Sequence, residues 1–328
     1  MLLAGDIGAT KTLIGLFAAA AERPAPVEAR VFSTVAHDGL EAIVEEFLAA
    51  RTEGRPHIEA ASFGVAGPIV EQVARLTNVP WEVNAAEVKR QFSLPRVTLL
   101  NDLEAMAYSM PVLGPEELVV LQEGRRVPTG NAALIAAGTG LGEALLHNVG
   151  GRLVPSPTEG GHADFAPRTP DEIGLLEDLT RVYGRVDYER VISGPGLVNV
   201  HRHFHPEGCP ECGPSVDPAR APSIISRSAL EHRCDRCVRA LQVFVSVYGA
   251  ESGNLALRSV ASAGLFVSGG IAPKILPALR TGLFMDAFRS KPPMTDFLEQ
   301  VPVAVVLNDR SGLLGAAVHA NQAASGRV

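Results

Sequence analysis

The sequence predicts an α/β protein built from two lobes. Short apolar runs of strand length alternate with segments of helical periodicity, which is the pattern of sheets connected by helices. Turns rich in small residues follow several of these runs, and such strand-and-turn units occur in both halves of the chain. The chain has 328 residues, which is long enough for two domains of ordinary size.

The N-terminal part of the chain predicts the strands of a first lobe. Residues 2–5 form an apolar run that enters a tight turn at Asp6-Ile-Gly8, and residues 12–18 predict the second strand of a hairpin. Residues 40–50 have helical periodicity, and residues 60–66 and 97–100 predict buried strands. The last of these strands delivers Asn101-Asp102 to the start of a helix over residues 103–108, a junction where ligands gather in open α/β sheets.

The rest of the chain predicts a second, larger lobe. Strands are expected at residues 118–121, 132–137 and 264–267, and helices at 172–182, 229–249 and 275–287. Residues 206–222 are rich in proline and predict a loop. The final strand, 301–307, and helix, 311–320, are expected to pack back onto the first lobe. The predicted domains are therefore 1–111 with 302–328, and 112–301.

The composition of the chain excludes several classes of protein. Hydrophobic residues make up 46% and charged residues 20%, a balance typical of soluble globular chains. The apolar runs are too short to cross a bilayer, and the N-terminus lacks the basic region of a signal peptide, which favours a cytoplasmic protein. The net charge of −7 comes without a basic cluster, which argues against nucleic acid as a partner.

Three turns and one carboxylate predict a nucleotide site. The turns are Asp6-Ile-Gly-Ala-Thr10, Gly138-Thr-Gly-Leu-Gly142 and Ser268-Gly-Gly270, and glycine lets backbone N–H groups approach a polyphosphate. Asp102 lies between the first two, where phosphoryl transfer requires a base. The structural alternative for Asp102 is a helix N-cap. Asp6 is expected to orient a metal ion through its waters or to serve as a turn carboxylate.

A second polar group is Glu159-Gly-Gly-His162. A carboxylate and an imidazole separated by two glycines can turn toward one small ligand and bind neighbouring hydroxyls. A metal site or a surface turn is the alternative. Glu189 precedes another glycine turn, and taken alone it is more often a solvated charge.

The four cysteines form two CxxC pairs, Cys209 with Cys212 and Cys234 with Cys237. This spacing is close to that of structural zinc sites, in which Zn²⁺ accepts four thiolates. Such an ion would hold the proline-rich loop in place without taking part in catalysis. The alternatives are small helix residues and reduced free thiols, which a cytosolic compartment favours over disulfides.

The motifs together resemble those of the bacterial glucokinases, a hexokinase-like group within the actin-like ATPase superfamily. The matching segments run through nearly the whole chain in the order of the family: Asp6-Ile-Gly-Ala-Thr10, Leu100-Asn-Asp-Leu-Glu104, Ala137-Gly-Thr-Gly-Leu-Gly142, Glu159-Gly-Gly-His-Ala-Asp-Phe-Ala-Pro167, Glu189-Arg-Val-Ile-Ser-Gly-Pro-Gly-Leu197, Gly253-Asn-Leu-Ala-Leu257 and Ser268-Gly-Gly-Ile-Ala-Pro273. The resemblance implies a two-lobed, ribonuclease H-like fold with a cleft between a small and a large domain.

The resemblance also implies an activity and a role for each motif residue. The expected reaction is ATP-dependent phosphorylation of D-glucose to glucose 6-phosphate with Mg²⁺, by a homodimer. Asp102 would accept the proton of the 6-hydroxyl, and the ring hydroxyls would be bound by Asn101, Glu159, His162 and Glu189. The phosphates would lie against Gly8, Ala9, Thr10, Gly138 and Thr139, and the adenosine against Gly269 and Gly270.

Two alanines depart from the family pattern. Ala9 stands where a second glycine is usual, and Ala136 likewise precedes the second phosphate turn, which leads us to expect altered nucleotide affinity with function retained. The compact cysteine-rich zinc signature of the related repressor and kinase family is missing after His162. The alternatives in function are a kinase for another hexose, such as fructose or mannose, and a sugar sensor without turnover.

Overall fold

The computed structural model describes residues 1–52, 54–76, 79–213 and 217–327, and the described chain divides into two compact units. The first comprises Met1–Gly114 and Asn308–Val328, and the second comprises Pro115–Leu307. Within the described residues, no helix is both long enough and apolar enough to cross a membrane.

The first unit contains a five-stranded sheet in the order β3-β2-β1-β4-β8. The hairpin of β1 and β2 is antiparallel, whereas β1, β4 and β8 run parallel, which brings their C-terminal ends to one edge. The strands are β1 Leu2–Ile7, β2 Lys11–Ala18, β3 Ala25–Ser33, β4 Ala60–Val65 and β8 Val97–Asn101. A separate small sheet consists of β5 Ile69–Val70, β6 Val73–Arg75 and β7 Glu82–Asn84.

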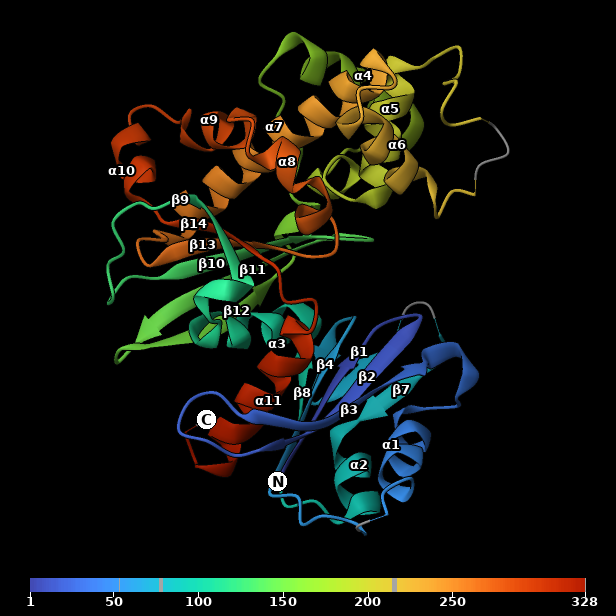
Figure 1. The fold of residues 1–328 in the computed structure, drawn as a ribbon, viewed down its shortest axis with the longest axis vertical. Helices are drawn as coiled ribbons and strands as arrows, with labels where there is room; N and C mark the ends of the chain where they lie inside the picture. Colours follow the sequence, from blue (N-terminus) through green and yellow to red (C-terminus); the bar gives the residue numbers. More distant parts are fainter. Residues whose placement is uncertain (53, 77–78, 214–216, 328) are drawn as a thin grey trace. The chain divides into compact units, whose positions relative to one another are not determined.

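Helices cover both faces of the five-stranded sheet because successive side chains of β1 point in opposite directions. Leu3 and Ile7 pack with the apolar face of α1, Leu40–Ala49, and with α2, Ala85–Phe92. Leu2 and Ala4 pack with α3, Asp102–Ser109, and with α11, Ser311–Ala324. Figure 1 shows these two pairs of helices on opposite sides of the strands.

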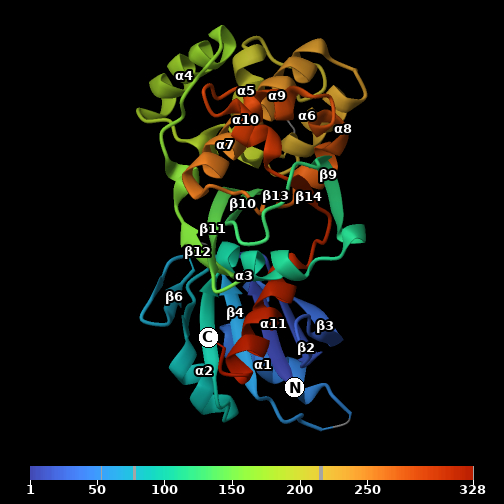
Figure 2. The ribbon, with the colours of Figure 1, turned by 90° about the vertical axis from the view of Figure 1, so that its left-hand side faces the viewer.

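The second unit contains a six-stranded sheet in the order β12-β11-β10-β13-β14-β9. Its strands are β9 Leu118–Gln122, β10 Ala132–Ala137, β11 Leu141–Val149, β12 Arg152–Thr158, β13 Gly264–Ser268 and β14 Val303–Val306. Its helices are α4 Pro170–Tyr183, α5 Gly194–Phe204, α6 Ala221–Leu230, α7 Asp235–Ser259, α8 Leu276–Leu279, α9 Leu283–Arg289 and α10 Thr295–Gln300. Figure 2 shows α5, α7 and α9 on one side of β10, β13 and β14, where they form one apolar core with these strands.

The C-terminal strand corrects the expected domain boundary. Residues 301–307 were expected to pack onto the first lobe, but β14 lies between β13 and β9 in the second sheet. Val303 and Val305 are fully buried there, so the strand contributes to the core of the second unit. Only the helix that follows, α11, belongs to the first unit. The units therefore change after Gly114 and Leu307, whereas the sequence predicted residues 111 and 301.

Two predicted helices are divided in the structure. The segment 229–249 contains the end of α6, a turn with His232 at φ 53°, and the start of α7. The segment 275–287 is interrupted at Gly282, whose φ of 102° is incompatible with a continuous helix. Apolar periodicity runs across both breaks, which is why it did not reveal them. The predicted proline-rich loop 206–222 includes residues 214–216, which lie outside the described residues.

Candidate active site

The first glycine turn closes the β1–β2 hairpin and is held by Thr34. The Gly8 N–H donates to the Lys11 carbonyl at 3.0 Å, and the Thr34 N–H donates to the Thr10 carbonyl at 3.0 Å. The buried Thr34 hydroxyl donates to the Gly8 carbonyl at 2.8 Å and accepts from the Thr12 hydroxyl at 2.9 Å. Thr34 was missed in the sequence because a single threonine in an irregular segment carries no motif.

Asp6 lies near the end of β1 and Asp102 directly follows β8, the two strands that run parallel on either side of β4. Asp6 pairs with Gly64 of β4, and a Cβ at Gly64 would lie 2.7 Å from the Ala105 Cβ in the first turns of α3. A Cβ at Gly312, at the start of α11, would lie 2.7 Å from the Asp6 Oδ2. These two glycines therefore allow α3 and α11 to pack closely around the strand end that carries the Asp6 carboxylate.

The two carboxylates affect one another electrostatically. Burial and, to a smaller extent, the negative charge of Asp102 together raise the pKa of Asp6 to about 6. Two carboxylates that repel in this way favour a proton or a cation between them. Oxygen ligands of this kind suit Mg²⁺.

Asn101, and not Asp102, is the N-cap of α3. The Asn101 Oδ1 accepts from the N–H groups of Leu103 at 2.9 Å and Glu104 at 3.4 Å. Asp102 is the first residue of the helix, and its Oδ1 also accepts from the Leu103 N–H at 2.9 Å. The alternative of Asp102 as the cap is thus wrong. The cap fixes the start of α3, which holds the partly buried Asp102 carboxylate at the positive end of the helix.

The second glycine turn, between β10 and β11, is bound to Glu189. The Glu189 Oε2 accepts from the Leu141 N–H at 2.9 Å, and a Cβ at Gly140 would lie 2.5 Å from the same oxygen. The Gly138 carbonyl accepts from the Gly194 N–H at the start of α5 at 2.8 Å. Glu189 is therefore a partly buried, bound carboxylate, and the reading of a merely solvated charge is wrong.

The third glycine turn lies directly beside the second because β13 pairs in parallel with β10. Gly269 has a φ of 85°, and a Cβ there would lie 2.3 Å from the Ala137 carbonyl oxygen. The Ile271 N–H donates to the same oxygen at 3.2 Å. The positive φ and the close approach to the Ala137 carbonyl both require glycine at position 269, whereas Gly270 is exposed.

The structure gathers Glu159, Glu189 and a further residue, Asp187, around His162. The His162 Nδ1 donates to the Asp187 Oδ2 at 3.1 Å. This hydrogen bond raises the pKa of His162, and the charges of Glu189, Asp187 and Glu159 add to the effect. Asp187 was missed because its role depends on the fold, which pairs residues 164 and 187 across an isolated β-bridge. With Nδ1 bound in this way, the His162 Nε2 can bind a ligand hydroxyl.

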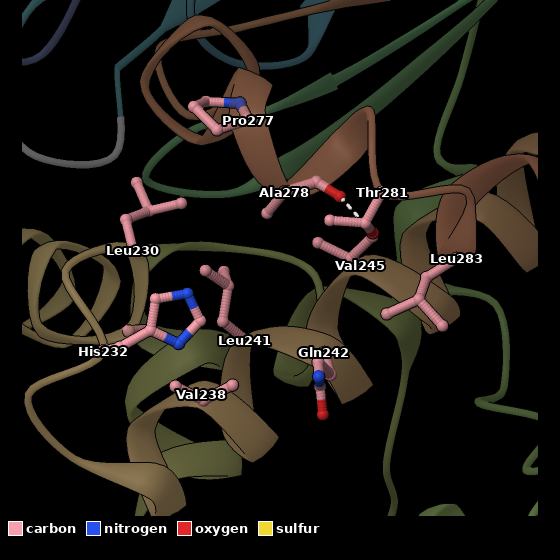
Figure 3. Close-up of a pocket in the computed structure, with 11 residues that line it drawn as sticks. Leu230, His232, Val238, Leu241, Gln242, Val245, Pro277, Ala278, Thr281 and Leu283 are labelled. Carbon is pink, nitrogen blue, oxygen red and sulfur yellow. Dashed lines mark hydrogen bonds between the residues drawn. The ribbon is translucent and has the colours of Figure 1, made fainter.

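An apolar cavity of about 200 Å³ lies elsewhere in the second unit. Figure 3 shows it among α6, α7, α8 and α9, with the Thr281 hydroxyl bound to the Ala278 carbonyl at 2.8 Å. Its lining consists of Ala229, Leu230, His232, Val238, Leu241, Gln242, Val245, Pro277, Ala278, Thr281 and Leu283. None of the site residues expected from the sequence contributes to this lining.

The two CxxC pairs meet in the second unit as four free thiols. Cys209 lies 3.7 Å from Cys237 between their Sγ atoms. Cys212 contacts Cys209, and Cys234 contacts both Cys209 and Cys237. The structure adds His201 and His205 to this group, which were not expected there. The zinc ion itself stays a prediction.

Comparison with known proteins decides the family. The family model described as Glucokinase matches residues 3–323. The chain belongs to the glucokinase family. This membership confirms the resemblance seen in the motifs. A glucokinase of Synechocystis sp. is 38% identical over 349 residues, which cover 98% of each protein.

Solved glucokinase structures share the fold of the family member described here. The glucokinase from an Antarctic psychrotroph has a TM-score of 0.86 at 30% identity, with 98% of each chain covered. The glucokinase of Balamuthia mandrillaris, solved with glucose, has a TM-score of 0.80 at 20% identity, covering 98% of this chain and 93% of that one. The actin-like ATPase fold that the resemblance implied is thereby confirmed.

Proposed function

We propose that this chain transfers the γ-phosphoryl group of ATP to the 6-hydroxyl of D-glucose, which forms glucose 6-phosphate and ADP. The observation that carries the proposal is the Asp102 carboxylate, held at the first position of α3 in a chain of the glucokinase family. We propose that this reaction brings glucose into glycolysis and that the protein acts in the cytoplasm.

Asp102 is the general base of the proposed mechanism. It accepts the proton of the glucose 6-hydroxyl as that oxygen attacks the γ-phosphorus, and the bond from phosphorus to the β-phosphate oxygen breaks. The Leu103 N–H donates to the Asp102 Oδ1 at 2.9 Å, which helps to orient the carboxylate. Proton transfer of this kind contributes about 10²–10⁴-fold to a rate.

The residues proposed to bind the sugar offer hydrogen-bond donors and acceptors that complement its hydroxyl groups. Glu159 and Glu189 accept hydrogen bonds from ring hydroxyls, and the His162 Nε2 accepts or donates according to its protonation. Asn101 uses its Oδ1 for the helix cap and can donate from Nδ2. Because Glu189 is fixed by Leu141 and His162 by Asp187, this set is ordered before sugar binds.

Phosphates lie against the backbone of the two glycine turns, Gly8–Thr10 and Gly138–Thr139. Thr10 and Thr139 are exposed and can donate hydroxyl hydrogen bonds to phosphate oxygens. The adenosine lies near Gly269 and Gly270, beside the second turn. Ala9 adds one methyl group to the first turn, for which we expect a modest change in nucleotide affinity.

Mg²⁺ accompanies the nucleotide in this proposal. The charge of Asp102 and the burial of Asp6 favour a cation beside them, and carboxylate oxygens are suitable ligands. Asp6 would hold the ion through its bound waters, and the ion would neutralise charge on the phosphates. The homodimer expected from the resemblance stays a prediction, which light scattering of the purified protein would test.

The decisive experiment is a coupled assay of ADP release with ATP, Mg²⁺ and a panel of sugars. We expect turnover that strongly favours glucose over mannose, fructose and N-acetylglucosamine. Higher kcat/KM for another hexose would assign a different kinase. Tight glucose binding without ADP release would contradict the ATP-dependent reaction and favour a sensor.

A further inference from the structure

The two CxxC pairs occupy local structures that suit metal ligands. Cys209 and Cys212 lie in the segment between α5 and α6. Pro210 follows the first cysteine and Gly213 follows the second. Cys234 is the N-cap of α7, and Cys237 lies one turn further along the same helix. A helix N-terminus favours the negative charge of a thiolate at this position.

The distance between the Cys209 and Cys237 sulfurs matches the separation of two sulfurs around one tetrahedral ion. With Zn–S bonds of about 2.3 Å, two sulfurs of a tetrahedral site lie about 3.8 Å apart. The Cys209 and Cys237 sulfurs lie 3.7 Å apart. A disulfide would bring them to about 2.05 Å. Cys212 and Cys234 contact this pair, so the structure holds the four sulfurs at non-bonded contact.

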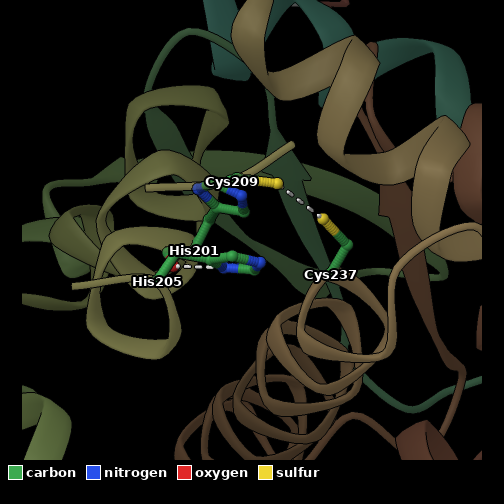
Figure 4. A group of neighbouring side chains, drawn as sticks. All are labelled: His201, His205, Cys209 and Cys237. Atoms are coloured by element: carbon green, nitrogen blue, oxygen red, sulfur yellow. Dashed lines mark hydrogen bonds between the residues drawn. The ribbon is translucent and has the colours of Figure 1, made fainter. Parts of the chain in front are cut away.

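Two histidines enclose the sulfurs, as Figure 4 shows for Cys209 and Cys237. The ligating atoms of His201, His205, Cys209 and Cys237 all lie within 4.8 Å of one another, and all four residues are buried. The His205 Nδ1 donates to the His201 carbonyl at 3.1 Å, and its Nε2 lies 3.3 Å from the Cys234 Sγ. The two imidazole rings are stacked with centroids 4.1 Å apart. His205 is thus oriented toward Cys234 by a second hydrogen bond.

We propose that Cys209, Cys212, Cys234 and Cys237 bind one Zn²⁺ ion as thiolates, and that His205 is a positioning residue whose Nε2 lies against the Cys234 sulfur. Binding releases the thiol protons to solvent and leaves a four-thiolate site of net charge −2, which the start of α7 stabilises. With four thiolates bound, the ion has no open position, so the site is structural.

The position of the site explains what the ion stabilises. It connects the segment after α5 to the start of α7, and the described residues 205–213 and 217–220 between α5 and α6 contain no helix or strand. The opposite end of α5 carries Gly194, whose N–H binds the Gly138 carbonyl of the second glycine turn. The metal therefore anchors the far end of the helix that supports this turn.

Metal content of the full-length protein, purified under reducing conditions without added zinc, is the first test. We expect about one Zn²⁺ per chain. After removal of zinc, Co²⁺ should bind with d–d bands at the long wavelengths typical of four thiolates, because each imidazole in place of a thiolate moves the bands to shorter wavelength. These measurements use the wild-type chain, so they do not depend on whether a cysteine variant folds.

Substitutions then distinguish the cysteine ligands from the neighbouring histidines. Cys212→Ser should lose most of the metal, whereas His205→Gln should keep the stoichiometry and the four-thiolate bands but release zinc faster to a chelator. His203→Gln is the matched control, because His203 lies in the last turn of α5, two residues before His205, and binds Asp178 at 2.6 Å. It should behave as wild type in both measurements.

Three results would overturn the proposal. Reduced wild-type protein that binds neither Zn²⁺ nor Co²⁺ would exclude the site. Bands of a three-thiolate, one-imidazole site that vanish in His205→Gln and persist in Cys212→Ser would exclude this ligand set. A disulfide within the freshly purified protein, detected by intact mass, would show that the thiols pair with one another.

Discussion

The Glu189 carboxylate accepts a hydrogen bond from the Leu141 N–H at 2.9 Å, which joins a short 3-10 helix, Tyr188–Arg190, to the glycine turn between β10 and β11. The contact is possible because residue 140 is glycine, since a Cβ there would lie 2.5 Å from the carboxylate. One carboxylate thus shapes the turn expected to bind phosphate. Under the function proposed above, Glu189 also binds a sugar hydroxyl, so it would couple sugar binding to the geometry of this turn.

Glu189→Gln tests this coupling. The variant keeps the shape of the side chain but removes its charge, and hydrogen bonds to a charged group contribute about 1.5–3 kcal/mol. We expect the KM for glucose to rise by roughly 10- to 100-fold. Steady-state kinetics would measure it, with Glu177→Gln, an exposed residue of α4, as the control. An unchanged KM would show that Glu189 has only a structural role.

Asp102→Asn tests the proposed base. The amide retains the hydrogen bond to the Leu103 N–H but cannot accept the substrate proton, so kcat should fall by about 10²-fold or more. Glucose binding, measured by calorimetry, should change little. The matched control is Glu87→Gln, an exposed carboxylate in the first turn of α2. Near-normal kcat in the Asp102 variant would exclude this residue as the base.

Asp6→Asn tests the consequence of a raised carboxyl pKa. Because the folded pKa is about 6 and the ordinary value is 3.8, the folded state binds this proton more tightly than the unfolded state. Stability therefore falls as the pH rises between these values, and the destabilisation is fully present above pH 6. We expect Asp6→Asn to raise Tm by roughly 2–4 °C at neutral pH and by less near pH 4.5, while ATP turnover falls.

The control for this prediction is Asp309→Asn, an exposed aspartate of the same unit. Its Tm should follow that of the wild type at both pH values. A gain in Tm for Asp6→Asn that is equal at the two pH values would contradict the assigned role of the Asp6 charge. Full activity of that variant would contradict its role beside the metal ion.

Asp187→Asn tests the residue that the sequence did not reveal. The hydrogen bond from His162 to Asp187 raises the pKa of His162, so its loss should lower that pKa, which NMR titration of the ring would measure. A raised histidine pKa stabilises the fold below the unfolded value of 6.5, and this contribution is lost as the pH rises through the folded pKa. The Tm difference between wild type and variant should therefore be larger at about pH 5.5 than at about pH 8.5.

The same variant should raise the KM for glucose by roughly 3- to 10-fold, the scale of one hydrogen bond that orients the ring. Asp164→Asn is the control, because Asp164 is exposed, lies across the same β-bridge and binds Arg185 instead of His162. If the two variants behaved alike, the effect would belong to the bridge and not to His162.

The local sequence pattern was sufficient to predict the strands and turns that carry the expected site residues. The strand and turn at Asp6, the strand that ends at Asn101, and the paired glycines at 269 and 270 all lie where periodicity and small residues indicated. Their signals are local, because a buried strand needs a continuous apolar run and a tight turn needs glycine. Helix boundaries at His232 and Gly282 were missed because apolar spacing continues across them.

The sequence by itself determined the alternation of strands and helices, the glycine turns and the family of this chain, since these follow from residue type and short-range spacing. Only the tertiary structure placed β14 in the second sheet, made Asn101 the helix cap, set Asp187 against His162 and brought His205 to the cysteines. The placement of β14, the contact of Asp187 with His162 and the approach of His205 to the cysteines depend on contacts between residues distant in the chain. The cap at Asn101 depends on which of two adjacent polar side chains the backbone favours at the helix start. Such outcomes are decided by packing, which no short pattern records.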